Sequence, residues 1–401
     1  MDKFKLTVFL GALAALAPLS MDMYLPSLPL MLEEFNVEPS LIQLTLTMTM
    51  VGMAIGQIVA GPISDRYGRK TPLKLGMLAF AVSTFGCMVS NSIWIFLMFR
   101  LFQGLSGAFG IVIARAIARD LCQGADLTRL FAMLMLVNGL APILAPIIGG
   151  QILFFATWHE IFALLALIGM ILWISSIKFN ETMPKDMRAA DITSSFKNFT
   201  LLMKDRYFLG HCLMQCFFGA SFFGYIAGSS FLFQNIYNVS PQVYSAIFGG
   251  IGALIALSGT IPAKFAGKIQ EIKMLAWTIG QAIVGSSLFL CCVIFKAPIQ
   301  LTLATLVITV PTMSVFGATS FSLAMRKNGH MAGSASALIG FFSMISGGLM
   351  APLVGIAGSH NALPMAIIML LGYVGSLIFF LKMIYSEHHR GFLIMDHQNK
   401  R

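Results

Sequence analysis

The chain has 401 residues, of which 57% are hydrophobic and only 10% are charged, and its formal net charge is +10. Soluble domains carry about 25% charged residues, so the composition excludes a soluble protein and indicates a membrane protein with several spans. The basic residues lie in short segments between apolar runs and form no basic face on a folded domain, which excludes nucleic acid as the reason for the charge.

A membrane-spanning helix needs about 20 apolar residues. Twelve segments satisfy this, and residues 180–206 form the one long polar connection between them. We therefore predict an all-α integral membrane protein with an N-terminal six-helix bundle (1–179), a cytoplasmic linker (180–206) and a C-terminal six-helix bundle with a short cytoplasmic tail (207–401). The predicted spans are 6–31, 41–64, 72–91, 92–116, 130–154, 160–179, 207–231, 242–264, 274–295, 299–322, 333–356 and 362–385.

The basic residues also predict the orientation. With the N-terminus inside, all but three of the 26 Lys and Arg residues lie in cytoplasmic segments, and Lys296 alone is external. Cytoplasmic loops carry an excess of Lys and Arg, so both termini are expected in the cytoplasm.

Two local patterns suggest other interpretations, which we reject. Lys3 and Lys5 before an apolar run resemble a secretory signal, but further spans follow in place of a polar mature domain. Cys212 and Cys216 share one helix face, yet a metal site needs more ligands than two. No metal site and no cofactor is expected.

Asp22 is the only carboxylate predicted well inside a span. Burying an ionised carboxylate is costly, so an intramembrane Asp is a functional candidate by default. The alternative is that the first helix ends near Ser20 and that Asp22 caps an external turn before Pro26 and Pro29.

The turn between the second and third spans carries the pattern G-x3-D-R-x-G-R-K. So short a charged turn makes the two helices antiparallel neighbours. The second glycine of the pattern, Gly68, can adopt the positive φ angle that a tight turn needs. A basic turn without a special role is the alternative interpretation. The residues of the pattern are Gly61, Asp65, Arg66, Gly68 and Arg69.

Arg100 is predicted roughly 12 Å below the outer end of the fourth span, at a depth similar to that of Asp22. The matched depth suggests pairing of the two charges, directly or through water, although a snorkelling arginine is the alternative. At the cytoplasmic end of the same span, Asp120 could accept a hydrogen bond from Arg66 or Arg69, or could simply be a solvated helix end.

The fifth span contains two prolines four residues apart, followed by two glycines: Pro142, Pro146, Gly149 and Gly150. Each proline removes a helical hydrogen bond, and the glycines offer a flat surface. An ordinary kinked helix is the alternative. The segment Ala145–Gly149 is echoed by Ala351–Gly355 near half a chain length later, which favours duplication of a six-helix unit.

Three features coincide: the charged turn, Arg100-x-x-Gln-Gly and the proline and glycine pattern of the fifth span. With the runs Met21–Pro29 and Ala114–Asp120, they resemble the major facilitator superfamily, and within it the bicyclomycin-resistance (Bcr/CflA) type of drug:proton antiporter. The resemblance implies a bacterial inner-membrane exporter in which two bundles rock around a central cavity.

The resemblance also implies residue roles. Asp22 matches the proton-coupling acid of the first span, and Arg100 matches the basic residue linked to it. Asp65, Gly68 and Arg69 match a conformational latch, to which Gly61, Arg66 and Asp120 are added here. Some relatives have a second acid where this chain has Ala14, so one proton per cycle is the simpler expectation.

The expected partners are a small-molecule substrate, protons and membrane lipids, with no nucleic acid, and the protein is expected to be a monomer. The alternative functions are a proton-coupled exporter of one endogenous solute, such as a siderophore or amino acid, a membrane sensor, and an uptake symporter. An enzyme is disfavoured because no nucleophile–base pair is evident. By span and depth, the substrate-cavity candidates are Tyr24, Gln43, Gln103, Asn138, Phe222, Tyr225 and Gln234.

Overall fold

The computed structural model describes residues 3–188, 193–328 and 331–386. Within these ranges every regular element is a helix. Twelve helical segments are long and apolar enough to cross a membrane. The expected all-α integral membrane architecture is therefore confirmed.

Six spans form the N-terminal bundle, and the first of them is interrupted. It runs over Phe4–Phe35 and consists of α1 (Lys3–Asp22), the 3₁₀ turn η1 (Leu25–Ser27) and α2 (Leu28–Phe35). The other five spans are α3 (Pro39–Tyr67), α4 (Lys70–Met88), α5 (Ile93–Leu121), α6 (Gly124–Phe155) and α7 (Trp158–Lys178).

A connection with the 3₁₀ turn η2 (Lys185–Met187) and the helix α8 (Thr193–Lys204) leads to the C-terminal bundle. Four of the six C-terminal spans consist of two helical pieces. The six are α9 (Arg206–Phe231) with the π-helical turn η3 (Leu232–Ile236), α10 (Pro241–Ser258) with α11 (Ile261–Lys264), α12 (Glu271–Ile294), α13 (Ile299–Thr309) with α14 (Thr312–Asn328), α15 (Ala332–Val354), and α16 (Leu363–Phe379) with the π-helical turn η5 (Phe380–Tyr385).

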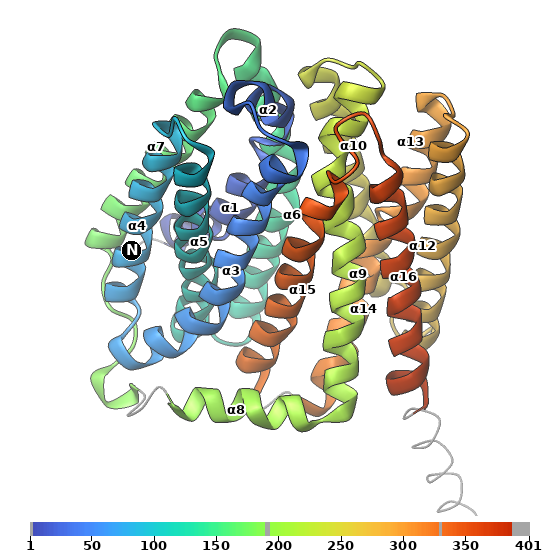
Figure 1. Ribbon diagram of the computed structural model, residues 1–401. Coiled ribbons are helices and arrows are strands. Elements are labelled where there is room, and N and C mark those ends of the chain that lie inside the picture. Colours follow the sequence, from blue (N-terminus) through green and yellow to red (C-terminus); the bar gives the residue numbers. More distant parts are fainter. Residues whose placement is uncertain (1–2, 189–192, 329–330, 387–401) are drawn as a thin grey trace, which may run out of the picture.

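The two bundles stand side by side, and α8 lies across one end of the molecule (Figure 1). We call this the α8 end and the opposite end, where α2 lies, the α2 end. Phe199 and Leu202 of α8 are buried against Phe208 of α9 and Ala335 and Leu338 of α15. The short amphipathic helix is thus fixed to the C-terminal bundle.

Two antiparallel helix pairs join the bundles, α3 with α15 and α6 with α10. The pairs are related by the expected duplication, because the second span meets the eleventh and the fifth meets the eighth. Thr47 of α3 donates a hydrogen bond to the carbonyl of Gly348, 2.6 Å away. Gly249 and Gly252 of α10 pack on Ile143 of α6. Small residues at these contacts let the helix backbones approach closely, as is common between membrane helices.

The interruption of the first span follows from its prolines, because a proline has no N–H to donate to the preceding turn. Regular helix stops at Asp22, and Pro29 leaves the carbonyl of Leu25 without its α-helical donor. The Ser230 hydroxyl of α9 donates to that carbonyl at 2.8 Å, and Gln234 donates to the carbonyl of Pro26 at 3.1 Å. The interrupted part of the first span is therefore hydrogen-bonded to the C-terminal bundle near the α2 end.

Candidate functional site

Asp22 is the last residue of α1, and its side chain is only 6% exposed. It therefore does not cap a solvent-exposed turn, which was the alternative interpretation of its position. No other described residue forms a hydrogen bond or ion pair with the carboxyl group.

Arg100 is fully buried in the N-terminal bundle, where it bonds mainly to backbone. Its Nη1 donates to the carbonyl of Ser20 at 3.0 Å and its Nε to the carbonyl of Thr45 at 3.4 Å. The guanidinium also stacks over the ring of Tyr24, 4.2 Å from the centroid. A cation at the C-terminal end of α1 is favourable because the helix dipole is negative there.

No direct ion pair joins Arg100 and Asp22 in this conformation, so the direct form of the expected pairing is absent here. The physical reason is the early end of α1, which leaves carbonyl groups that take the donors of the guanidinium. The hydrogen bond to Ser20 still places Arg100 at the level of the α1 terminus, two residues before Asp22.

Two of the proposed cavity residues belong instead to the polar core around Arg100. Gln103 accepts from Arg100 and donates to the Thr84 hydroxyl at 2.9 Å, and the Tyr24 hydroxyl lies 2.9 Å from that of Thr45. Both side chains are fully buried within the N-terminal bundle. They position Arg100 and do not face the C-terminal bundle.

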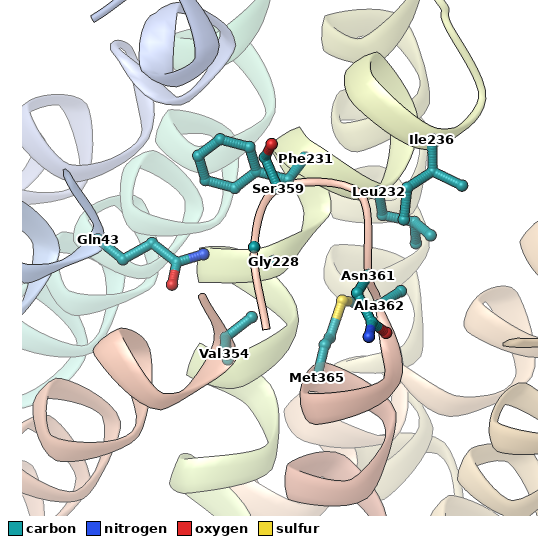
Figure 2. A pocket seen from close by; sticks show the side chains of 11 residues that line it. Gln43, Gly228, Phe231, Leu232, Ile236, Val354, Ser359, Asn361, Ala362 and Met365 are labelled. Carbon is teal, nitrogen blue, oxygen red and sulfur yellow. The ribbon is translucent and has the colours of Figure 1, made fainter. Parts of the chain in front are cut away.

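Other cavity candidates lie on helices that meet between the bundles. Gln43 donates to the carbonyl of Ala227 at 3.2 Å and borders a small hollow at the α2 end (Figure 2). Gln234 is bonded to the first span, as described above, and Tyr225 is buried. Asn138 of α6 and Phe222 of α9 are partly exposed.

The glycines of the fifth span are contact points. A Cβ atom on Gly149 would overlap the carbonyl oxygen of Met23, and one on Gly150 would overlap the hydroxyl of Ser245 on α10. Gln242 of α10 also donates to the carbonyl of Gly150 at 3.0 Å. α6 remains one helix through Pro142 and Pro146, so this pair of glycines meets both the broken first span and the C-terminal bundle.

The charged turn is folded around Arg69, which is 6% exposed. Its Nε donates to Asp120 at 2.9 Å, and its Nη1 donates to Asp65 and to the Ser64 hydroxyl. Of the two partners considered for Asp120, the structure has Arg69. Arg66 is exposed, lies over the ring of Tyr67 and is not part of this network. Gly61 lies one turn earlier, and a Cβ atom added to it would lie 3.9 Å from the side chain of Val112.

Sequence reasoning missed the linker residues that complete this network. Glu181 accepts from the backbone N–H groups of Arg69 at 2.8 Å and Lys70 at 3.2 Å, at the N-terminus of α4, and Thr182 donates to Asp120 at 3.0 Å. Gly68, with φ of +86°, leaves room for the carboxylate. Burial raises the pKa of Glu181, but backbone N–H donors outweigh it and hold that pKa below its usual value. An acidic residue just after the sixth span was the available signal.

A membrane protein of twelve helices in two duplicated bundles, with a polar site at a broken first helix, has the architecture of a solute transporter. Residues 10–352 match the model of the major facilitator superfamily, and the chain belongs to that family.

Two relatives with similar sequences support this family assignment. The chain is 38% identical to the MFS-type transporter YdgK of Bacillus subtilis, over 94% of this chain and 95% of that protein. It is 31% identical to the bicyclomycin resistance protein homolog of Haemophilus influenzae, over 89% of this chain and 90% of the relative. The fold resembles the crystal structure of a D-xylose-proton symporter with a TM-score of 0.74, at 14% identity, over 96% of this chain and 98% of the other.

These findings confirm the resemblance to the drug:proton antiporter type within the superfamily. The protein is a multi-pass membrane transporter and not an enzyme.

Proposed function

We propose that the protein is a proton-coupled antiporter that exports small drug-like molecules across the bacterial inner membrane by alternating access. Both termini and the α8 end face the cytoplasm, in accordance with the positions of Lys and Arg. The name of the Haemophilus influenzae relative supports export of antibiotic-like molecules, and the buried Asp22 supports coupling to protons. The protein acts as a monomer of two bundles, 1–179 and 207–401, joined by the linker 180–206.

One observation carries the proposal: Asp22 is buried between the bundles and lacks a described donor. An ionised carboxylate that lacks a donor in such a place is costly, so the neutral acid is the form that this arrangement tolerates until a donor reaches the group. The negative end of the α1 dipole acts in the same direction. A carboxyl group that is stable only when neutral in one conformation must exchange a proton when the bundles move.

The cycle follows from this. When the α2 end is open, Asp22 takes a proton from outside and substrate leaves. When the α8 end is open, the proton leaves to the cytoplasm and the carboxylate again favours binding of substrate. The membrane potential contributes roughly 2.3 kcal/mol for each charge moved through 100 mV.

The remaining residues have supporting roles in this cycle. Arg100 fixes the end of α1 and, with it, the position of Asp22. The latch of Gly61, Asp65, Arg66, Gly68, Arg69 and Asp120 stabilises the α8 end, with Asp65 approaching the N-terminus of α15 when the α2 end opens. Substrate binds between the bundles, where Gln43, Asn138, Phe222, Tyr225 and Gln234 are the candidate contacts.

The test uses the full chain in everted membrane vesicles loaded with a pH-sensitive dye. Chloramphenicol, ethidium and tetraphenylphosphonium are added in turn, and proton release is followed together with uptake of each compound. Asp22→Asn is expected to abolish compound-induced proton release. Asp186→Asn, which changes an exposed carboxylate of the linker, is the matched control and should behave as the unmodified protein.

Undiminished proton release by Asp22→Asn would contradict the proposal. Transport of a single endogenous solute and of none of the three compounds would instead identify a dedicated exporter, the alternative that the same motifs allow.

A further inference from the structure

Two tyrosines of the C-terminal bundle are buried where that bundle meets the end of α1. Tyr225 of α9 is 1% exposed and Tyr244 of α10 is fully buried. Both rings contact Phe248, and that of Tyr225 lies parallel to it at a centroid distance of 5.8 Å. The Tyr244 hydroxyl lies 3.0 Å from the Ser229 hydroxyl, whereas the buried Tyr225 hydroxyl has no hydrogen-bond partner among the described residues.

Backbone contacts bring Asp22 to this place. The residue after it, Met23, touches Gly149 of α6, and Gly150 touches Ser245, which follows Tyr244. On the side of α9, the hydroxyl of Ser230, five residues after Tyr225, donates to the carbonyl of Leu25, three residues after Asp22, at 2.8 Å.

Few titratable or charged groups among the described residues lie at this point. They are Tyr24, whose hydroxyl lies 2.9 Å from that of Thr45, Arg100 on α5, Tyr225 on α9 and Tyr244 on α10. Arg100 uses its Nε and Nη1 on backbone carbonyls and on Gln103, and its buried Nη2 has no partner among the described residues. On the C-terminal side Tyr244 is bonded to Ser229, so Tyr225 holds the donor of that bundle that is free to reach a carboxylate.

We propose that the Tyr225 hydroxyl is the positioning group through which the C-terminal bundle responds to Asp22. It donates a hydrogen bond to the ionised carboxylate after the proton leaves, and it loses that bond when Asp22 is protonated again. A donor on one bundle and an acceptor on the other hold the α2 end closed while Asp22 is ionised. This deepens the proposed function and rests on it for its role in transport, but the contact itself can be measured separately.

The experiment follows the carboxyl group directly by infrared spectroscopy of the full chain in lipid vesicles as pH is varied. The C=O band that Asp22→Asn removes belongs to Asp22, and the pH midpoint of its loss is the readout, so no substrate is needed. A hydroxyl donor stabilises the ionised form, so Tyr225→Phe should raise this midpoint by about one pH unit. In the Asp22→Asn background, Tyr225→Phe should change nothing further in the spectrum.

Tyr373→Phe is the matched control. Tyr373 of α16 is also fully buried, and its hydroxyl also lacks a partner among the described residues. It takes no part in the contacts around Asp22 that are described above. Its removal should leave the Asp22 midpoint unchanged. If Tyr225→Phe folds poorly, Tyr225→Leu replaces it, because leucine also lacks a donor and should shift the midpoint in the same direction.

The inference is overturned if Tyr225→Phe leaves the midpoint where Tyr373→Phe leaves it, or lowers it. It is also overturned if the Asp22 band persists at all pH values, because the hydroxyl would then have no carboxylate to bind. A normal shift combined with unchanged proton release by Asp22→Asn in vesicles would contradict the proposed function and leave the contact established.

Discussion

Arg100 donates a hydrogen bond to the backbone carbonyl of Ser20 over 3.0 Å, and so the one arginine buried in the fourth span caps the C-terminal end of the first helix. The acid of the site, Asp22, follows two residues later. The position of the proton-binding group is therefore fixed by a side chain that does not pair with it.

Arg100→Ala should destabilise the protein by about 3 kcal/mol, because it leaves the carbonyls of Ser20 and Thr45 and the amide of Gln103 buried without their donor. Arg100→Lys should recover little of this, since an ammonium group cannot provide the planar fork or stack equally on Tyr24. The measurement is the melting temperature in detergent. Arg129→Ala, at an exposed position, is the control, and an equal effect of both changes would refute the role of Arg100.

Gly149→Ala should displace the broken part of the first span from α6 within the N-terminal bundle, because its Cβ would overlap the carbonyl oxygen of Met23. Overpacking of this kind costs about 1–3 kcal/mol, so transport should fall about tenfold. Gly139→Ala in the same helix has nothing within 4 Å of the added Cβ and should transport normally. Uptake of a transported compound into everted vesicles compares the two, and similar rates would show that this contact is not needed.

Glu181→Gln should remove about 1 kcal/mol of stability at pH 7, a modest value because the carboxylate is partly solvated. The native pKa of Glu181 is lowered, so its contribution is present above the unfolded pKa of about 4.5 and is lost as pH falls through the lower native value. The difference in melting temperature from the unmodified protein should vanish in acid. Glu33→Gln, on the exposed face of α2, should show no such difference at either pH.

Gly68→Ala should be more harmful than Gly267→Ala, although both residues have positive φ angles, of +86° and +76°. Each substitution pays the conformational cost of roughly 1–2 kcal/mol. Only at Gly68 would the methyl group also overlap the Glu181 carboxylate, whereas nothing lies within 4 Å at Gly267. Melting temperatures of the two variants test this, and equal losses would show that the Glu181 contact contributes nothing.

Many residues of the site could be identified from the sequence, but the residues that they contact could not. The turn pattern pointed to Arg69 and Asp120, and the structure adds Glu181 and Thr182 from the linker. Tyr24 and Gln103 were selected by depth, but depth does not say which way a helix face points, and both face Arg100. The direct form of the expected Asp22–Arg100 pairing is absent because backbone carbonyls, freed by the end of α1, compete for the same donors.

The sequence by itself determined the twelve spans and the placement of Asp22 and Arg100 at one depth, because hydropathy and length are properties of each segment alone. Only the tertiary structure decided that α1 stops at Asp22, that Gly149 meets Met23, and that the Tyr225 hydroxyl is buried without a hydrogen-bond partner among the described residues. These relationships depend on the rotation of each helix and on the fit of one bundle against the other. A pattern of apolar residues leaves both of these open, and close packing of backbones and buried polar groups fixes them.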